Sequence, residues 1–297
     1  MAASAEAAES FWLKRIAEGG YFSCELGAGA GQALEGFWRD VFSTARPGSR
    51  VLEIGCGAAH VSTWAAEAGR QLEVIASDIH DHAEVVPLRP GMRFLGGARA
   101  EAIPLPAGSV DMVVSNFAFE YTPSPAQAAG ELVRVLRPGG VAALVLHSQD
   151  SALAANSRHL LQTNRTLAEA DIPGRIRRAA ALRSDHLSRR KLLKDVLKMR
   201  GLIADSGPYF DMADRLWRND PKARLDYEAL EKTADGLTEM AQAQLGAALD
   251  PQALAALGQH FASLGMEVST SEITGQYASV NRQKFGWLMF LSRRRFA

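Results

Sequence analysis

The stretch Val51-Leu52-Glu53-Ile54-Gly55-Cys56-Gly57 decides the fold of this 297-residue chain. A short apolar run ends in two glycines separated by one residue, and residues 58–68 after it have helical character. Such a pattern predicts a buried strand followed by a helix. Glycines at the turn between them let the backbone bend sharply and approach a ligand, because glycine has no Cβ. A turn of this kind is typical of the edge at which doubly wound sheets bind nucleotides.

The turn differs from that of dinucleotide-binding proteins. The pyrophosphate fingerprint requires a third glycine three residues after the second, and His60 occupies that position. Because no phosphate would be cradled there, the turn suits a smaller nucleoside ligand.

Four later segments follow the turn in a fixed order. They are a strand that ends in an acid, a loop, an apolar strand and a helix that ends in Pro-Gly-Gly: Glu73-Val74-Ile75-Ala76-Ser77-Asp78, Ala100-Glu101-Ala102-Ile103-Pro104-Leu105, residues 109–116 and residues 131–140. Together with the glycine turn they resemble the motifs of class I S-adenosylmethionine-dependent methyltransferases, in the order and at the spacing of that family. The resemblance covers roughly residues 48–148 and says almost nothing about the methyl acceptor.

The resemblance implies an α/β fold, a Rossmann-like seven-stranded methyltransferase sheet with N-terminal helices and a large helical insertion between strands 5 and 6. Alternating apolar runs and helical stretches independently predict a parallel sheet with helices on both faces. The strands are expected at about 50–55, 72–77, 93–95, 110–115 and 141–147, followed by an antiparallel pair at 267–273 and 287–292.

Helical spacing extends beyond the sheet region. Helices are expected over residues 5–17 and 31–44, and the resemblance implies that such elements close over the cofactor. From about residue 150 to 264 the pattern is helical, with many Ala, Leu, Arg and Gln residues. We therefore divide the chain into a cofactor-binding core of residues 1–149 and 265–297, and a helical cap of residues 150–264 for the substrate.

The resemblance implies S-adenosylmethionine as the cofactor and assigns residues to it. Glu53 and the two glycines would orient the methionine end, and Cys56 is a small packing residue between them. Asp78 would accept hydrogen bonds from both ribose hydroxyls, and Ile79 would contact adenine. The full set expected to bind the cofactor is Glu53, Gly55, Cys56, Gly57, Asp78, Ile79, Ala100, Glu101, Asn116 and Phe117.

Two positions depart from the family pattern. Ala59 stands where the family often has a glycine, and Arg99 stands where relatives often have an Asp that binds the adenine amine. Arginine has no acceptor to offer that amine. Adenine would therefore be read by backbone groups of Ala100 and Glu101.

Candidate catalytic residues follow the fourth and fifth strands. Glu120 and Tyr121 stand where many relatives carry a His pair, and His147 ends the fifth strand. Both strand ends face one crevice, where a carboxylate or an imidazole could remove a proton from an acceptor. The alternatives are a structural Glu120 that bonds the following helix, a Tyr121 that only forms the pocket wall, and a His147 that is only a hydrogen-bonded wall residue.

Composition favours a soluble enzyme, and the expected location is the cytoplasm. Lys+Arg and Asp+Glu both number 33, so the formal net charge is zero and no whole-protein field attracts nucleic acid or an anionic membrane. The two cysteines do not suggest a disulfide framework. His80 and His82 lack a third spaced ligand, so no metal is expected. A signal peptide and a membrane-spanning apolar run are not expected either.

We expect methyl transfer to an oxygen or nitrogen of a small-molecule or peptide acceptor beneath the helical cap. The basic stretch at 175–200 leaves open an RNA or protein methyltransferase, although such a stretch is more often a solvated helix face. A non-catalytic partner subunit with this fold is a further alternative. The intact glycine turn and Asp78 argue against it.

Overall fold

The computed structural model describes residues 23–182, 185–200, 202–203, 207–220, 222–277 and 280–294. The helix expected over residues 5–17 lies outside these ranges. The chain divides into two compact units. One contains the described residues up to Ala155 and those from Gly246 onward, and the other contains the described residues between Asn156 and Leu245.

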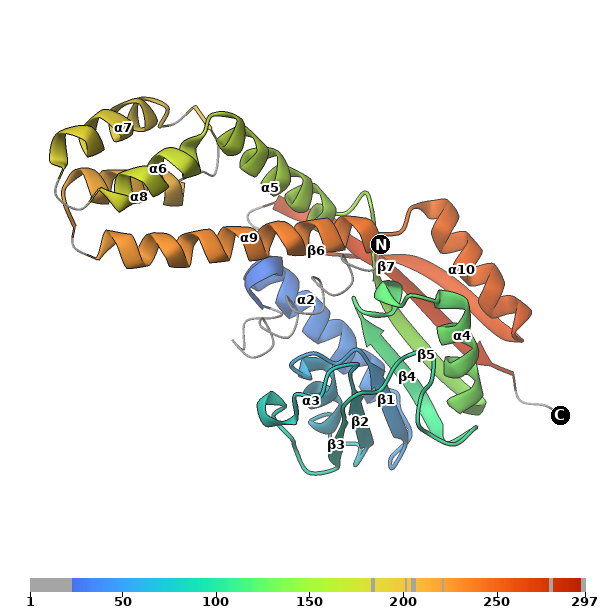
Figure 1. Cartoon of the computed structure of the whole chain (residues 1–297). Helices are drawn as coiled ribbons and strands as arrows, with labels where there is room; N and C mark the ends of the chain where they lie inside the picture. Colours follow the sequence, from blue (N-terminus) through green and yellow to red (C-terminus); the bar gives the residue numbers. More distant parts are fainter. Residues whose placement is uncertain are drawn as a thin grey trace. The chain divides into compact units, whose positions relative to one another are not determined.

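The first unit is built on seven strands: β1 Arg50–Ile54, β2 Glu73–Ser77, β3 Met92–Leu95, β4 Val110–Asn116, β5 Leu136–His147, β6 Met266–Tyr277 and β7 Val280–Arg293. They form one sheet with the order β3-β2-β1-β4-β5-β7-β6 (Figure 1). The first five strands pair in parallel, and β7 runs antiparallel between β5 and β6. The expected Rossmann-like sheet is therefore confirmed.

The strand β5 begins earlier than the sequence pattern predicts. Val110 pairs with Leu136, whereas Met112 pairs with Val141, so the extra residues between Leu136 and Val141 form an irregularity at the edge of the ladder. Pro138 and the two glycines after it disfavour strand structure, and for that reason the expected strand started only at Val141.

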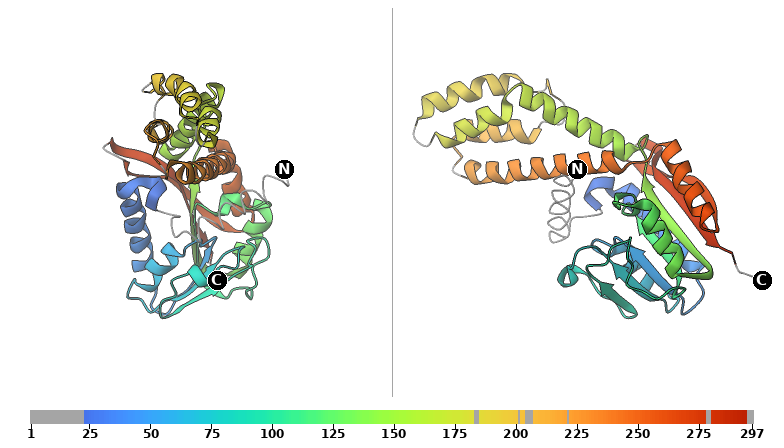
Figure 2. Two further views of the ribbon diagram at one scale, coloured as in Figure 1. Left: turned by 60° about the vertical axis from the view of Figure 1, so that its left-hand side comes forward. Right: turned by 45° about the vertical axis from the view of Figure 1, so that its right-hand side comes forward.

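Helices cover both faces of this sheet. The helices α2 (Ser23–Ser43) and α3 (His60–Ala66) bury Trp38 and Val61 against one face. The helices α4 (Pro125–Val135) and α10 (Pro251–Ser263) lie side by side on the other face (Figures 1 and 2). Along β5, alternate side chains serve the two faces, so the strand reads as a continuous apolar run.

The helix α2 starts eight residues before the expected position of 31. Its first turns contain Gly27, Gly29 and Gly31, and glycine lowers helix propensity by about 1 kcal/mol per residue. Because of these glycines, the sequence pattern did not predict the first turns of this helix.

The second unit is helical. It contains α6 (Ile172–Ala181), α7 (His186–Lys198) and α8 (Gly207–Trp217), together with most of α5 (Ala152–Glu169) and α9 (Ala223–Ala247). Its own core includes Ile176, Leu193, Phe210 and Leu216.

The boundaries of this unit correct the expected insertion of residues 150–264. The helix α10 belongs to the first unit, because Leu254 and Phe261 are buried in the core beneath the sheet. A sequence pattern gives the period of a helix but not the partner against which its apolar side packs, so α10 could not be separated from the helices before it. None of the described helices is long and apolar enough to cross a membrane.

Candidate active site

The turn after β1 has the backbone that its glycines predict. Gly55 has φ +68°, and a Cβ built on it would lie 2.4 Å from the Cβ of Ala118. Ala59 also has a left-handed φ, of 57°, although it is alanine. It is fully buried and stands at the N-cap of α3. The backbone at Ala59 thus keeps the left-handed conformation that glycine would favour there. For alanine this conformation costs about 1–2 kcal/mol.

Glu53 fastens the turn to α3. Its side chain is buried, and Oε2 accepts hydrogen bonds from the backbone nitrogen of Ser62 at 2.8 Å and from Ser62 Oγ at 2.5 Å. Burial raises the pKa of Glu53 to about 8, against the lowering effect of these two hydrogen bonds. Glu53 therefore positions the backbone of the turn.

Asp78 joins the end of β2 to the glycine turn. Oδ2 accepts a hydrogen bond from the backbone nitrogen of Gly57 at 2.9 Å, and Oδ1 accepts one from that of His80 at 3.1 Å. His82 Nε2 lies 2.8 Å from the carbonyl oxygen of Gly57. A carboxylate has about four acceptor positions, so Asp78 retains capacity for two ribose hydroxyls.

Cys56, Asp78 and His82 bring possible metal-ligand atoms within 4.8 Å of one another. Burial raises the pKa of the Cys56 thiol, which disfavours the thiolate that metals bind. Both oxygens of Asp78 and Nε2 of His82 already bond the backbone. This chemistry suits a hydrogen-bonded turn better than a metal centre.

An open pocket lies at the carboxyl ends of β1, β2 and β4. Its cavity volume is about 160 Å³. It is lined by Ile54, Gly55, Gly57, Asp78, Ile79, His80, Ala98, Ala100, Glu101, Phe117, Ala118, Tyr121, Thr122 and Pro123. Three residues of the expected cofactor set, Glu53, Cys56 and Asn116, are not part of this lining. Ile79 is 43% exposed and offers an apolar surface to a ring.

Asn116, at the end of β4, is hydrogen-bonded to the helix α2. Its Oδ1 accepts a hydrogen bond from Trp38 Nε1 at 2.9 Å, and Trp38 is fully buried in α2. These residues are 78 positions apart in sequence, and no local pattern predicts their contact.

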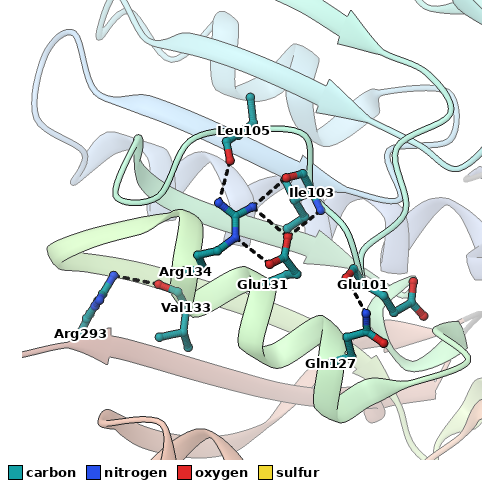
Figure 3. Close-up of polar contacts among 8 residues, drawn as sticks. All are labelled: Glu101, Ile103, Leu105, Gln127, Glu131, Val133, Arg134 and Arg293. Atoms are coloured by element: carbon teal, nitrogen blue, oxygen red, sulfur yellow. Dashed lines mark hydrogen bonds and ion pairs between the residues drawn. The ribbon is translucent and has the colours of Figure 1, made fainter.

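Glu101 lines the pocket and also contacts the start of α4. Its Oε1 accepts a hydrogen bond from the backbone nitrogen of Ser124 at 3.2 Å. Its carbonyl oxygen accepts one from Gln127 Nε2 at 3.1 Å, which Figure 3 shows. The loop expected to meet adenine is thereby attached to the start of α4.

An arginine on α4 clamps the next part of this loop. Arg134 donates to the carbonyl oxygens of Ile103 at 2.7 Å and Leu105 at 2.8 Å, and Glu131 accepts from the nitrogen of Ile103 at 2.8 Å (Figure 3). Arg134 and Glu131 also pair at 2.6 Å, and this hydrogen bond lowers the pKa of Glu131. Figure 3 also shows Arg293 donating to Val133 at 2.8 Å.

We expect Arg134→Ala to weaken S-adenosylhomocysteine binding about 5- to 30-fold, because removal of one partner from such hydrogen bonds costs about 1–2 kcal/mol. Calorimetric titration measures this change. Arg137→Ala is the matched control, since Arg137 pairs with Asp111 outside the pocket lining. Equal affinities of Arg134→Ala and the wild type would mean that the clamp does not position the pocket.

Glu120 and His147 are brought together. Glu120 lies in the short 3₁₀ helix η2 (Phe119–Tyr121), and its Oε1 is 2.7 Å from His147 Nδ1 and 2.7 Å from the backbone nitrogen of His147. Neither residue is among those that line the pocket, whereas Tyr121 is. The His147 ring contacts Phe117 at a centroid distance of 4.5 Å and the edge of Tyr121 at 5.7 Å.

The basic stretch at 175–200 is partly neutralised within the helical unit. Ion pairs join Arg177 to Glu231, Arg178 to Asp171, Arg200 to Asp211 and Lys198 to Asp195. Arg189 is buried, and Arg190 lies over the ring of Trp217. Arg183 lies outside the described residues. These pairs favour the interpretation of a solvated helix surface.

The doubly wound sheet, the glycine turn and the carboxylate at the end of β2 define a nucleoside-binding α/β protein. Residues 52–144 match the family model of a methyltransferase domain. This match supports the class I S-adenosylmethionine-dependent methyltransferase family that the motifs predict, and the cofactor of that family is S-adenosylmethionine.

Several known proteins are similar to part of this chain. A malonyl-[acyl-carrier protein] O-methyltransferase of Pectobacterium atrosepticum is 36% identical over 99 residues, which are 33% of this chain and 39% of that protein. An uncharacterised methyltransferase of Mycobacterium bovis is 39% identical over 107 residues, or 35% and 42% of the two chains. The chain thus spans about two fifths of the length of these relatives. A solved S-adenosylmethionine-dependent methyltransferase of Aquifex aeolicus is 21% identical, covers 46% of this chain and 73% of its own, and has a TM-score of 0.38.

Proposed function

We propose that this protein is an enzyme that binds S-adenosylmethionine in the pocket at the strand ends and catalyses methyl transfer to a small-molecule or peptide acceptor. The observation that carries the proposal is the carboxylate of Asp78, which lies beside the glycine turn and inside the pocket lining. The cofactor supplies a methyl group that its sulfonium already activates. The protein contributes positioning and the exclusion of water.

The cofactor would be held by backbone and side chains of the turn and the neighbouring strand ends. Gly55 and Gly57 leave room for close approach, because neither carries a Cβ. Asp78 accepts hydrogen bonds from the ribose hydroxyls, while Ile79 and Phe117 provide apolar walls.

The acceptor side would include Tyr121 and the Glu120–His147 pair, which follow β4 and end β5. The helical unit is inserted after β5, and we assign acceptor specificity to it. The name of the relative from Pectobacterium makes a carrier-bound malonyl group the carboxylate acceptor against which hydroxyl and amine acceptors are compared. The arginines of α6 that pair with acids inside the helical unit give no support to an RNA acceptor.

Asp78→Ala tests the cofactor site. We expect it to weaken S-adenosylhomocysteine binding about 10- to 150-fold, because hydrogen bonds to a charged group contribute about 1.5–3 kcal/mol. Calorimetric titration measures both proteins. Asp40→Ala, on the exposed side of α2, removes the same group away from the pocket and should bind like the wild type. Unchanged affinity in Asp78→Ala would reject the assigned site.

A further inference from the structure

The Glu120–His147 pair is a buried ionisable cluster to which the cofactor site gives no role. We propose that Glu120 is a positioning residue that holds His147 as the tautomer with its proton on Nδ1, so that Nε2 takes a proton from the methyl acceptor. The inference rests on the proposed methyltransferase function and deepens it. It restricts the acceptor to a hydroxyl or amine with a removable proton and excludes a carboxylate.

One oxygen of Glu120 determines the tautomer. Oε1 is 2.7 Å from the backbone nitrogen of His147, and this N–H group can only donate. Oε1 is also 2.7 Å from Nδ1. Because this oxygen already acts as an acceptor, it accepts a second hydrogen bond, from the N–H group at Nδ1. A neutral imidazole carries a proton on one nitrogen only, so Nε2 keeps its lone pair.

The side chains of the Glu120–His147 pair are almost completely buried. The side chain of Glu120 is 0% exposed and that of His147 is 7% exposed. Glu120 Oε2 is buried without a hydrogen-bond partner among the described residues. A buried carboxylate is costly when it stands alone. A proton on Nε2 converts the pair into a hydrogen-bonded ion pair and offsets that cost.

The fold holds the pair against the pocket. Asn116 of β4 pairs with Val145 of β5, so the ends of these two strands are adjacent. The His147 ring packs on Phe117 and on the edge of Tyr121, and both of these residues line the pocket. A proton acceptor at this place serves chemistry beside the glycine turn.

The balanced step for a hydroxyl acceptor defines the acceptor class. The acceptor oxygen forms a bond to the methyl carbon, the carbon–sulfur bond breaks, and its electron pair stays on sulfur. The O–H proton goes to His147 Nε2, and the imidazolium is stabilised by Glu120. A carboxylate acceptor has no proton to lose near neutral pH, since its pKa is about 4. It would also add a second negative charge near Glu120.

Nuclear magnetic resonance of the histidine side chains tests the pair without the need for an acceptor. Long-range ¹H–¹⁵N spectra of the wild type should show His147 with Nδ1 protonated and Nε2 unprotonated, with His147→Ala used for assignment. Glu120→Ala removes the oxygen that accepts the Nδ1 hydrogen bond, so His147 should populate the tautomer with its proton on Nε2. Glu84→Ala, an exposed change of the same kind, should leave the tautomer of His147 unchanged.

The proton on Nε2 in the wild type, or an unchanged tautomer in Glu120→Ala, would overturn the positioning role. If Glu120→Ala does not fold, the tautomer of the wild type still decides. S-adenosylhomocysteine binding is measured on the same samples. Failure of the wild type to bind rejects the proposed function, whereas binding with the wrong tautomer rejects this inference alone.

The acceptor class is tested with a methyl-labelled cofactor and a deproteinised cell extract as the acceptor pool. A labelled product that resists mild base, as a methyl ether or a methylamine does, is expected. A base-labile methyl ester would overturn the acceptor class. No labelled product from enzyme that binds the cofactor would count against methyl transfer itself.

Discussion

Gly55→Ala is expected to destabilise the protein by about 2–5 kcal/mol and to reduce S-adenosylhomocysteine binding at least tenfold. Two costs combine at this position. A left-handed backbone costs alanine about 1–2 kcal/mol, and Gly55 has φ +68°. The new Cβ would also lie 2.4 Å from the Cβ of Ala118, and overpacking of this kind costs about 1–3 kcal/mol.

Gly48→Ala separates the two costs. Gly48 has φ +75°, and nothing lies within 4 Å of an added Cβ. Gly48→Ala should therefore lower the free energy of unfolding only by the cost of the left-handed backbone, as measured by urea unfolding. It should bind S-adenosylhomocysteine like the wild type. If the two variants were equally stable, the close packing between the turn and Ala118 would be wrong.

Glu53→Gln is expected to alter the pH dependence of stability. Burial raises the pKa of Glu53 to about 8 from the ordinary value of 4.5, so between these values the folded protein holds a proton that the unfolded chain releases. Stability due to Glu53 is therefore fully present below pH 4.5 and is lost as the pH rises through about 8. The slope approaches about 1.4 kcal/mol per pH unit inside this window.

The difference in unfolding free energy between Glu53→Gln and the wild type isolates this group, because other titrations are common to both proteins. From pH 5 to pH 8, the stability of Glu53→Gln relative to the wild type should rise by on the order of 2–4 kcal/mol. Glu84→Gln, at an exposed position, should run parallel to the wild type. A parallel curve for Glu53→Gln as well would show that Glu53 is ionised in the folded state at pH 5.

The sequence predicted those parts of the fold that depend on local patterns. The glycine turn, the parallel strands and the closing antiparallel pair all have a signature within a few residues, and the sheet confirms them. The irregular start of β5, the glycine-rich start of α2 and the packing of α10 on the sheet were not predicted. In each of these, tertiary contacts outweigh a weak or ambiguous local preference.

In the candidate site, too, the residues with a local sequence signature were predicted and the long-range contacts were not. Asp78 and the glycines could be identified because each follows a strand at a family-specific distance. The contacts of Trp38 with Asn116 and of Arg134 with the loop at 103–105 could not, since they join residues 78 and about 30 positions apart. Glu120 and His147 were identified separately as candidates, and the structure adds their hydrogen bond.

Amide chemical-shift mapping with S-adenosylhomocysteine tests the central claim most directly, because it reports where the ligand binds and needs no acceptor. The account predicts that the largest shifts fall at Gly55, Gly57, Asp78, Ala100 and Phe117, which line one pocket from separate strand ends. Amides of α6, α7 and α8 should change less. No shifts at millimolar ligand, or shifts centred away from the glycine turn and Asp78, would contradict the proposed cofactor site.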